Sequence, residues 1–122
     1  TSSSHESRMQ VIFDYSQSNF TDPTLNTGRL AEKISMNPSA FCRFFKTRTN
    51  KTFSLFLNEV RISKACQLLI NGEAPIKQIC YDVGFSSLTN FNRTFKSFKA
   101  ISPSTYRDNY SSFRQSSLKE VS

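Results

Sequence analysis

Apolar positions recur at helical spacing along most of this 122-residue chain, and no segment keeps a period-two alternation. Two short segments share one pattern: residues 41–46 and 91–96 both read Phe-x-Arg-x-Phe-Lys. On a helix, the two Phe of each segment lie four positions apart on one face, and the Arg between them points away from it. The pattern predicts two helices, each with an apolar back and a basic front.

Capping signals divide the chain into helices. Asn37 is a good N-cap before Pro38, which suits a first helical position, and Asn50 tolerates a left-handed C-cap. The helix of residues 8–19 is expected to bury a face made by Met9, Val11, Ile12 and Tyr15, and residues 1–7 are expected to be disordered. The expected helices cover residues 8–19, 27–34, 38–48, 52–71, 76–83, 88–98 and 102–107.

The repeat extends beyond the two Phe-x-Arg-x-Phe-Lys segments. Residues 30–36 align with residues 79–85 at an offset of 49, and one extra residue precedes Phe91. Each half therefore reads short helix, tight turn, helix, with the small Ala31 or Cys80 where two helices cross closely. This is the helix-turn-helix arrangement, whose second helix enters the DNA major groove.

The predicted fold class is all-α: about seven helices, in two helix-turn-helix subdomains of homeodomain-like type joined by a long linker helix. The linker helix of roughly 19 residues would span about 28 Å, against about 34 Å between successive major grooves on one face of DNA. A single chain would then read two grooves at once. The expected organisation is a lead-in and first helix (1–19), a first half (20–51), the connecting helix (52–71), a second half (72–110) and a polar tail (111–122).

The charge balance favours a polyanionic partner. The formal net charge is +7, and the segment from Arg29 to Arg107 alone holds 13 basic and 4 acidic residues, a net of +9. Such a surface attracts nucleic acid, anionic membranes or acidic proteins, and charge alone does not choose among them.

Several other classes find no support in the sequence. No apolar run approaches about 18 residues, so no transmembrane helix is expected, and the polar start lacks a secretory signal. The three cysteines are widely spaced and odd in number, which favours reduced thiols in a cytoplasmic protein. With a single His and no catalytic cluster, neither a metal site, a cofactor nor an enzyme activity is expected.

Several short motifs follow one another in chain order: Leu30-Ala31, Phe41-x-Arg43-x-Phe45-Lys46, Arg61-Ile62-x-x-Ala65-x-x-Leu68-Leu69, Ile76-x-x-Ile79, Val83-Gly84-Phe85, Phe91-x-Arg93-x-Phe95-Lys96 and Ser102-Pro103-x-x-Tyr106-Arg107. Together they resemble the DNA-binding domain of the AraC/XylS family of bacterial transcription regulators, and the resemblance covers about residues 20–107. Each motif is weak alone, but the ordered set is specific. Three positions depart from the family pattern. Asn50 and Ala100 stand where glycine is usual, and Ala100 predicts a differently shaped start of the last helix. Cys80 replaces the usual Ala, and a thiol is still a small group.

The candidate DNA contacts lie on the exposed fronts of the two helices expected to enter the major groove, residues 38–48 and 88–98, here the reading helices. Arg93 suits guanine and Asn92 suits adenine, while Ala40, Cys42 or Leu88 would meet a thymine methyl group. The rotation of each helix decides which of these side chains reach a base. The expected base-reading residues are Ser39, Ala40, Cys42, Arg43, Leu88, Thr89, Asn92 and Arg93. The expected phosphate contacts are Ser35, Lys46, Arg48, Lys51, Ser87, Lys96 and Lys99, with helix capping the stronger role for the two serines.

The resemblance implies double-stranded DNA as the main partner and transcription, activated rather than repressed, as the process. It also implies RNA polymerase as a partner and a longer parent protein whose sensor or dimerisation domain lies elsewhere. The alternative is a helical adaptor for an acidic protein surface, such as a polymerase subunit. A sequence-tolerant RNA binder would need exposed aromatic side chains, whereas these Phe are expected to be buried.

Overall fold

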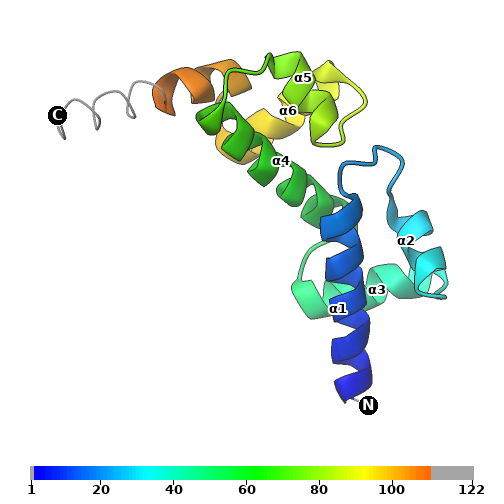
Figure 1. Cartoon of the computed structure of the whole chain (residues 1–122). Coiled ribbons are helices and arrows are strands. Elements are labelled where there is room, and N and C mark those ends of the chain that lie inside the picture. Colours follow the sequence, from blue (N-terminus) through cyan, green and yellow to red (C-terminus); the bar gives the residue numbers. More distant parts are fainter. Residues whose placement is uncertain (1, 111–122) are drawn as a thin grey trace. The chain divides into compact units, whose positions relative to one another are not determined.

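The computed structural model describes residues 2–110 of the chain, and this part is built from helices without a strand (Figure 1). It divides between residues 60 and 61 into two compact units, here the first and the second unit. The all-α prediction with about seven helices is confirmed. The helices are α1 (Ser2–Asn19), α2 (Thr27–Lys33), α3 (Pro38–Thr49), α4 (Phe53–Asn71), α5 (Ile76–Asp82), α6 (Leu88–Lys99) and a further helical stretch over residues 103–110.

Helix α1 differs from its prediction in two respects. It begins at Ser2, where residues 1–7 were expected to be disordered. Residues 2–7 contain neither Pro nor Gly, and extending an existing helix costs far less than starting one. The expected apolar face was also wrong at Val11, which is 48% exposed, whereas Ile12 and Ser16, one turn apart, are fully buried. The Ser16 hydroxyl is satisfied because it donates to the Ile12 carbonyl at 2.7 Å.

The core of the first unit gathers around the Phe pair of α3. Phe41 and Phe45 are fully buried, and Phe53 at the start of α4 packs edge-on against both, with ring centroids 5.5 Å apart in each pair. Aromatic rings prefer this arrangement to a face-to-face sandwich. The buried members of this core are Ile12, Leu25, Leu30, Ala31, Phe41, Phe45, Phe53 and Leu57.

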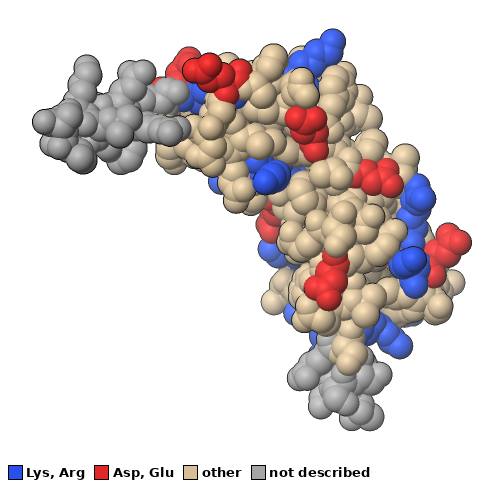
Figure 2. Space-filling view, viewed as in Figure 1, with Lys and Arg blue, Asp and Glu red and all other residues tan. Residues whose placement is uncertain are grey.

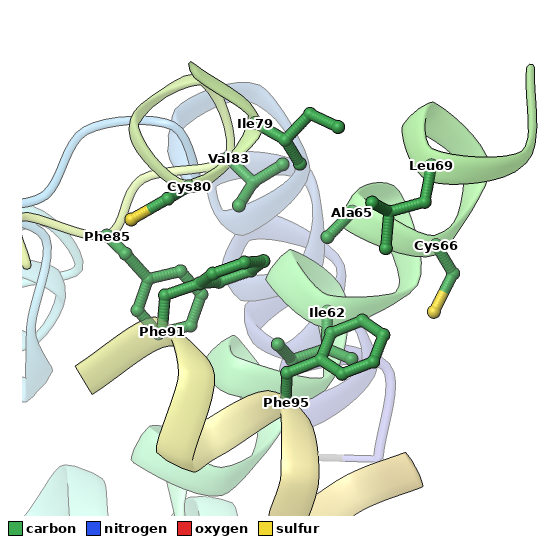
Figure 3. Close-up of a cluster of buried hydrophobic side chains, with 10 residues drawn as sticks. All are labelled: Ile62, Ala65, Cys66, Leu69, Ile79, Cys80, Val83, Phe85, Phe91 and Phe95. Atoms are coloured by element: carbon green, nitrogen blue, oxygen red, sulfur yellow. The ribbon is translucent and has the colours of Figure 1, made fainter. Parts of the chain in front are cut away.

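The core of the second unit repeats this plan around α6. Figure 3 shows Phe91 and Phe95 pointing from α6 towards Ile62 and Ala65 of α4. Cys80 is fully buried, and burial raises the pKa of its thiol, so it serves as a small neutral group at the helix crossing, as expected. The buried members are Ile62, Ala65, Cys66, Leu69, Ile79, Cys80, Val83, Phe85, Phe91 and Phe95.

The two tight turns that aim α3 and α6 have the same backbone. After α2, Met36 N–H donates to Ala31 O at 2.8 Å and Ser35 N–H donates to Glu32 O at 3.1 Å. After α5, Phe85 N–H donates to Cys80 O at 3.0 Å and Gly84 N–H to Tyr81 O at 3.1 Å. Both are Schellman motifs, which end a helix through one residue with positive φ.

The N-caps follow the sequence signals. Asn37 accepts from Ser39 N–H through its side chain, with Pro38 at the first helical position, and Ser87 accepts from Asn90 N–H. The extra residue of the second half, Ser86, lies between its turn and its cap. Helices α3 and α6 therefore both begin at a side-chain N-cap after an equivalent turn, despite the insertion.

The C-caps of α3 and α6 are alike, which corrects one expectation. Asn50 is left-handed with a φ of 62°, as predicted, and its N–H donates to Lys46 O at 2.8 Å. Ala100, which was expected to change the shape of the start of the last helix, also adopts the left-handed φ usual for glycine, of 70°, and its N–H donates to Lys96 O at 2.8 Å. The surrounding fold imposes the geometry although Ala disfavours it.

Candidate DNA-binding surface

The basic fronts of α3 and α6 lie opposite their buried Phe pairs. Arg43 and Arg93 are both exposed, whereas the Phe residues two positions before and after each of them are fully buried. Since each helix is tied to its unit by two Phe side chains and a capped first turn, its front is held in a fixed direction within that unit. The structure thus presents one guanidinium per unit at equivalent helical places.

The other expected base-reading residues divide by burial. Ser39, Cys42, Thr89 and Asn92 are exposed on the same helices as the two arginines. Ala40 is partly buried, and Leu88 is partly buried because it packs against the core of the second unit. Much of the Leu88 side chain is therefore engaged with the protein.

The structure brings Arg93 together with a residue that the sequence reasoning missed. An Nη atom of Arg93 donates to Oδ1 of Asn90 at 3.1 Å, and Asn90 is exposed. The spacing of three residues on one helix was the available signal. The corresponding position of α3 is Ala40, which has no polar side-chain atom.

Four of the expected phosphate-contacting residues are exposed near the ends of the reading helices. Lys46 and Arg48 lie in the last turn of α3, and Lys96 and Lys99 lie in the last turn of α6. Positive side chains there also interact favourably with the negative end of the helix dipole. The same residues therefore strengthen the helix and present positive charge to a polyanion.

The remaining expected phosphate contacts have other partners or settings. Lys51 is partly buried and pairs with Glu59 at 2.8 Å, so part of its charge is neutralised within the unit. The Ser87 hydroxyl is occupied as the N-cap of α6. Ser35 is exposed at the turn before α3 and has a positive φ of 59°.

A second missed feature is a pair of guanidinium groups on one aromatic ring. Arg8 of α1 lies 5.7 Å and Arg48 of α3 lies 5.5 Å from the centroid of the Phe44 ring. Both distances are within the range of cation–π attraction. Arg48 follows Phe44 by four residues on one helix, a spacing that is visible in the sequence. The approach of Arg8 depends on how α1 packs against α3, so no local pattern indicated it.

Charged side chains of both signs lie on the surface of each unit (Figure 2). In the view of Figure 2, acidic and basic side chains are interspersed on both units. Among the residues that the structure describes, no group of three or more His, Cys, Asp or Glu is placed to hold a metal ion. The three thiols are unpaired, and Cys42 is the exposed one, as its place on the front of α3 predicted. No helix of the described part is long and apolar enough to cross a membrane.

Residues 30–109 match the family model of a helix-turn-helix domain, and this match runs from within α2 through α3, α4, α5 and α6. The chain belongs to the AraC-type helix-turn-helix family. The chain is therefore a DNA-binding domain of the kind found in transcription regulators. This family consists of DNA-binding proteins and is not a class of enzymes. The resemblance noted from the motifs is thereby confirmed.

Two curated relatives and one solved structure are similar to this chain over most of its length. It is 37% identical over 102 residues to the transcriptional activator RhrA of Rhizobium meliloti, covering 82% of this chain and 32% of RhrA. It is 30% identical over 109 residues to the transcriptional activator RhaS of Escherichia coli, covering 89% of this chain and 39% of RhaS. Its fold matches the C-terminal domain of AraT, a response regulator from Geobacillus stearothermophilus, with a TM-score of 0.79, 28% identity and 84% coverage of both chains. The chain thus spans 32% and 39% of the length of these two curated relatives.

Proposed function

We propose that this AraC-type domain reads specific duplex DNA by inserting α3 and α6 into two adjacent major grooves, and thereby activates transcription. The observation that carries the proposal is the repeat of one device. Each unit has a Schellman turn, a capped helix, two fully buried Phe and an exposed Arg between them. A helix presented in this way is the element that enters the major groove in helix-turn-helix proteins.

Within each groove, Arg43 and Arg93 are the proposed principal readers, each able to donate two parallel hydrogen bonds to a guanine. Asn92 suits adenine, while Ser39 and Thr89 add shorter hydrogen-bonding groups. Cys42, Ala40 and the exposed part of Leu88 would contact thymine methyl groups. The second unit carries more polar readers than the first, so we expect it to contribute more of the sequence preference.

Affinity that is independent of sequence is assigned to Lys46, Arg48, Lys96 and Lys99, with Ser35 as a hydroxyl donor to phosphate. Lys51 and Ser87 make smaller contributions in this proposal, because the first is paired with Glu59 and the second caps α6. Each phosphate neutralised by a Lys or Arg releases counterions, so binding should weaken as salt rises.

For the parent regulator, we propose a separate sensor or dimerisation domain, contact with RNA polymerase and action in the bacterial cytoplasm. The support is that RhrA and RhaS are named transcriptional activators and are about three times as long as the segment matched here.

The test is selection of bound sites from a random duplex library at about 150 mM salt, which suppresses non-specific phosphate binding. We expect an enriched site with two blocks about one helical turn apart. The Arg43→Ala/Arg93→Ala double variant serves as the matched control and should enrich nothing. Both side chains are exposed, so their removal leaves the two cores intact. Equal enrichment by the wild type and this variant would contradict the proposal.

A further inference from the structure

Arg93 is held by a neighbour, and Arg43 has no equivalent neighbour at the corresponding position. The hydrogen bond from the Arg93 guanidinium to Asn90 Oδ1, at 3.1 Å, spans three residues of α6. Ala40 occupies the corresponding position before Arg43, and its methyl group cannot accept a hydrogen bond. The two units therefore differ in how firmly their proposed guanine readers are oriented.

The backbone of Asn90, whose side chain accepts from Arg93, is anchored. The main-chain N–H of Asn90 donates to the Ser87 hydroxyl, which ties Asn90 into the capped first turn of α6. The next residue, Phe91, is fully buried in the core of the second unit. The backbone of Asn90 thus lies between two anchors, the cap and the core.

The hydrogen bond leaves Arg93 able to read a base. A guanidinium has five N–H donors, and Asn90 uses one of them. Two parallel donors are enough for O6 and N7 of guanine. Holding a long, flexible side chain before binding reduces the conformational entropy that it loses on binding.

We propose that Asn90 is a positioning residue for Arg93, a role that makes the base preference of the second unit sharper than that of the first. This inference rests on the proposed function, since it takes Arg93 to be a guanine reader. Asn90 acts through Arg93 and touches no base itself. Replacing Asn90 should therefore alter the preference for guanine only while Arg93 is present.

The experiment uses the selected duplex and a set of duplexes that replace the guanine assigned to Arg93 by each other base. The measured quantity is the ratio of Kd values between these duplexes and the selected one, so that general changes in affinity cancel. The proteins compared are the whole chain and its N90A, N90D, R93A and N90A/R93A variants. Thermal unfolding of each variant verifies that the fold is retained, as expected for exposed positions on a helix.

The N90A variant should lower the guanine preference about three- to tenfold, the size expected for losing the order of one long side chain. The N90D variant keeps an oxygen in the same place and should retain the preference within about twofold. In the R93A background, N90A should change the ratio no further. A full wild-type preference in N90A, a loss in N90D as large as that in N90A, or a further loss in the double variant would each overturn the inference.

The same set separates this inference from the proposed function. If R93A lowers the guanine preference and N90A leaves it unchanged, Arg93 reads the base and Asn90 does not position it. If R93A itself leaves the preference for this guanine unchanged, the proposed reading by Arg93 fails, and the inference fails with it.

Discussion

Ser35 and Gly84 occupy the same place in the two Schellman turns of this protein, and both have a positive φ, 59° for Ser35 and 105° for Gly84. Only Gly accepts this region without a steric cost. The first unit thus makes its turn with a strained residue where the second unit uses the favoured one.

The S35G substitution should therefore stabilise the chain. The left-handed region costs a residue with a Cβ about 1–2 kcal/mol in the folded state. The greater entropy of Gly in the unfolded chain offsets about 0.5–1 kcal/mol of the stability gained by removing this cost. We expect a net gain of roughly 0.5–1 kcal/mol in the free energy of unfolding, measured by urea titration. The reciprocal G84S substitution should destabilise, and a loss of stability in S35G would contradict the account.

A second gain is expected at the end of α6. Ala100 is left-handed with a φ of 70°, so A100G should raise the free energy of unfolding by about 0.5–1 kcal/mol for the same reason. The matched control is N50G at the end of α3, where Asn already tolerates this region and a change of only a few tenths of a kcal/mol is expected. Equal effects of the two substitutions would show that the φ of Ala100 is not the cause.

The core of the second unit should be sensitive to the loss of its buried aromatic rings. Phe91 is fully buried, and F91A should cost about 3–5 kcal/mol of stability through lost contacts and a cavity. The neighbouring Asn92 is exposed, so N92A should change stability by less than about 0.5 kcal/mol. Denaturant unfolding compares the two, and similar costs would refute the assignment of inward and outward faces of α6.

Alkaline pH should weaken the second unit through Tyr106. Burial, and then hydrogen bonding with Cys66, raise the pKa of the Tyr106 phenol above its ordinary value of 10.0. Above pH 10 the unfolded chain loses this proton while the folded chain retains it, so stability should fall as the pH rises further.

The Y106F substitution tests this prediction because it removes the titrating group and keeps the ring that packs 5.4 Å from Phe95. Its stability should fall less steeply between pH 10 and pH 11 than that of the wild type, as followed by urea unfolding at each pH. The exposed Tyr81, changed to Phe, is the control and should leave the slope unaltered. Identical slopes for the wild type and Y106F would rule out this role for Tyr106.

The parts of the fold that the sequence predicted are those decided by local chemistry. The caps at Asn37 and Ser87 depend on side chains that accept from backbone N–H groups within a few residues, and the cap at Asn50 depends on its tolerance of a positive φ. The burial of the Phe pairs follows from their spacing on one face. Because both signals occur twice in the chain, the helix-turn-helix repeat was readable before the structure.

The features that the sequence did not predict are decided by packing. The left-handed Ala100 contradicts local preference, because the fold around it needs the turn. Whether Val11 or Ser16 faces the core of the first unit depends on how α1 packs, and so does the approach of Arg8 to Phe44. The bond between Asn90 and Arg93 had a visible spacing, but it also needs a particular rotamer of each side chain.

In the proposed function, α3 and α6 each read bases in a major groove. Methylation interference on the selected duplex tests it most directly, since a methyl group on guanine N7 blocks that groove edge. We expect interference at guanines in two blocks about one helical turn apart. The R43A variant should lose the sensitivity in one block and R93A in the other. Interference confined to one block, or a pattern that neither variant changes, would contradict reading by both helices.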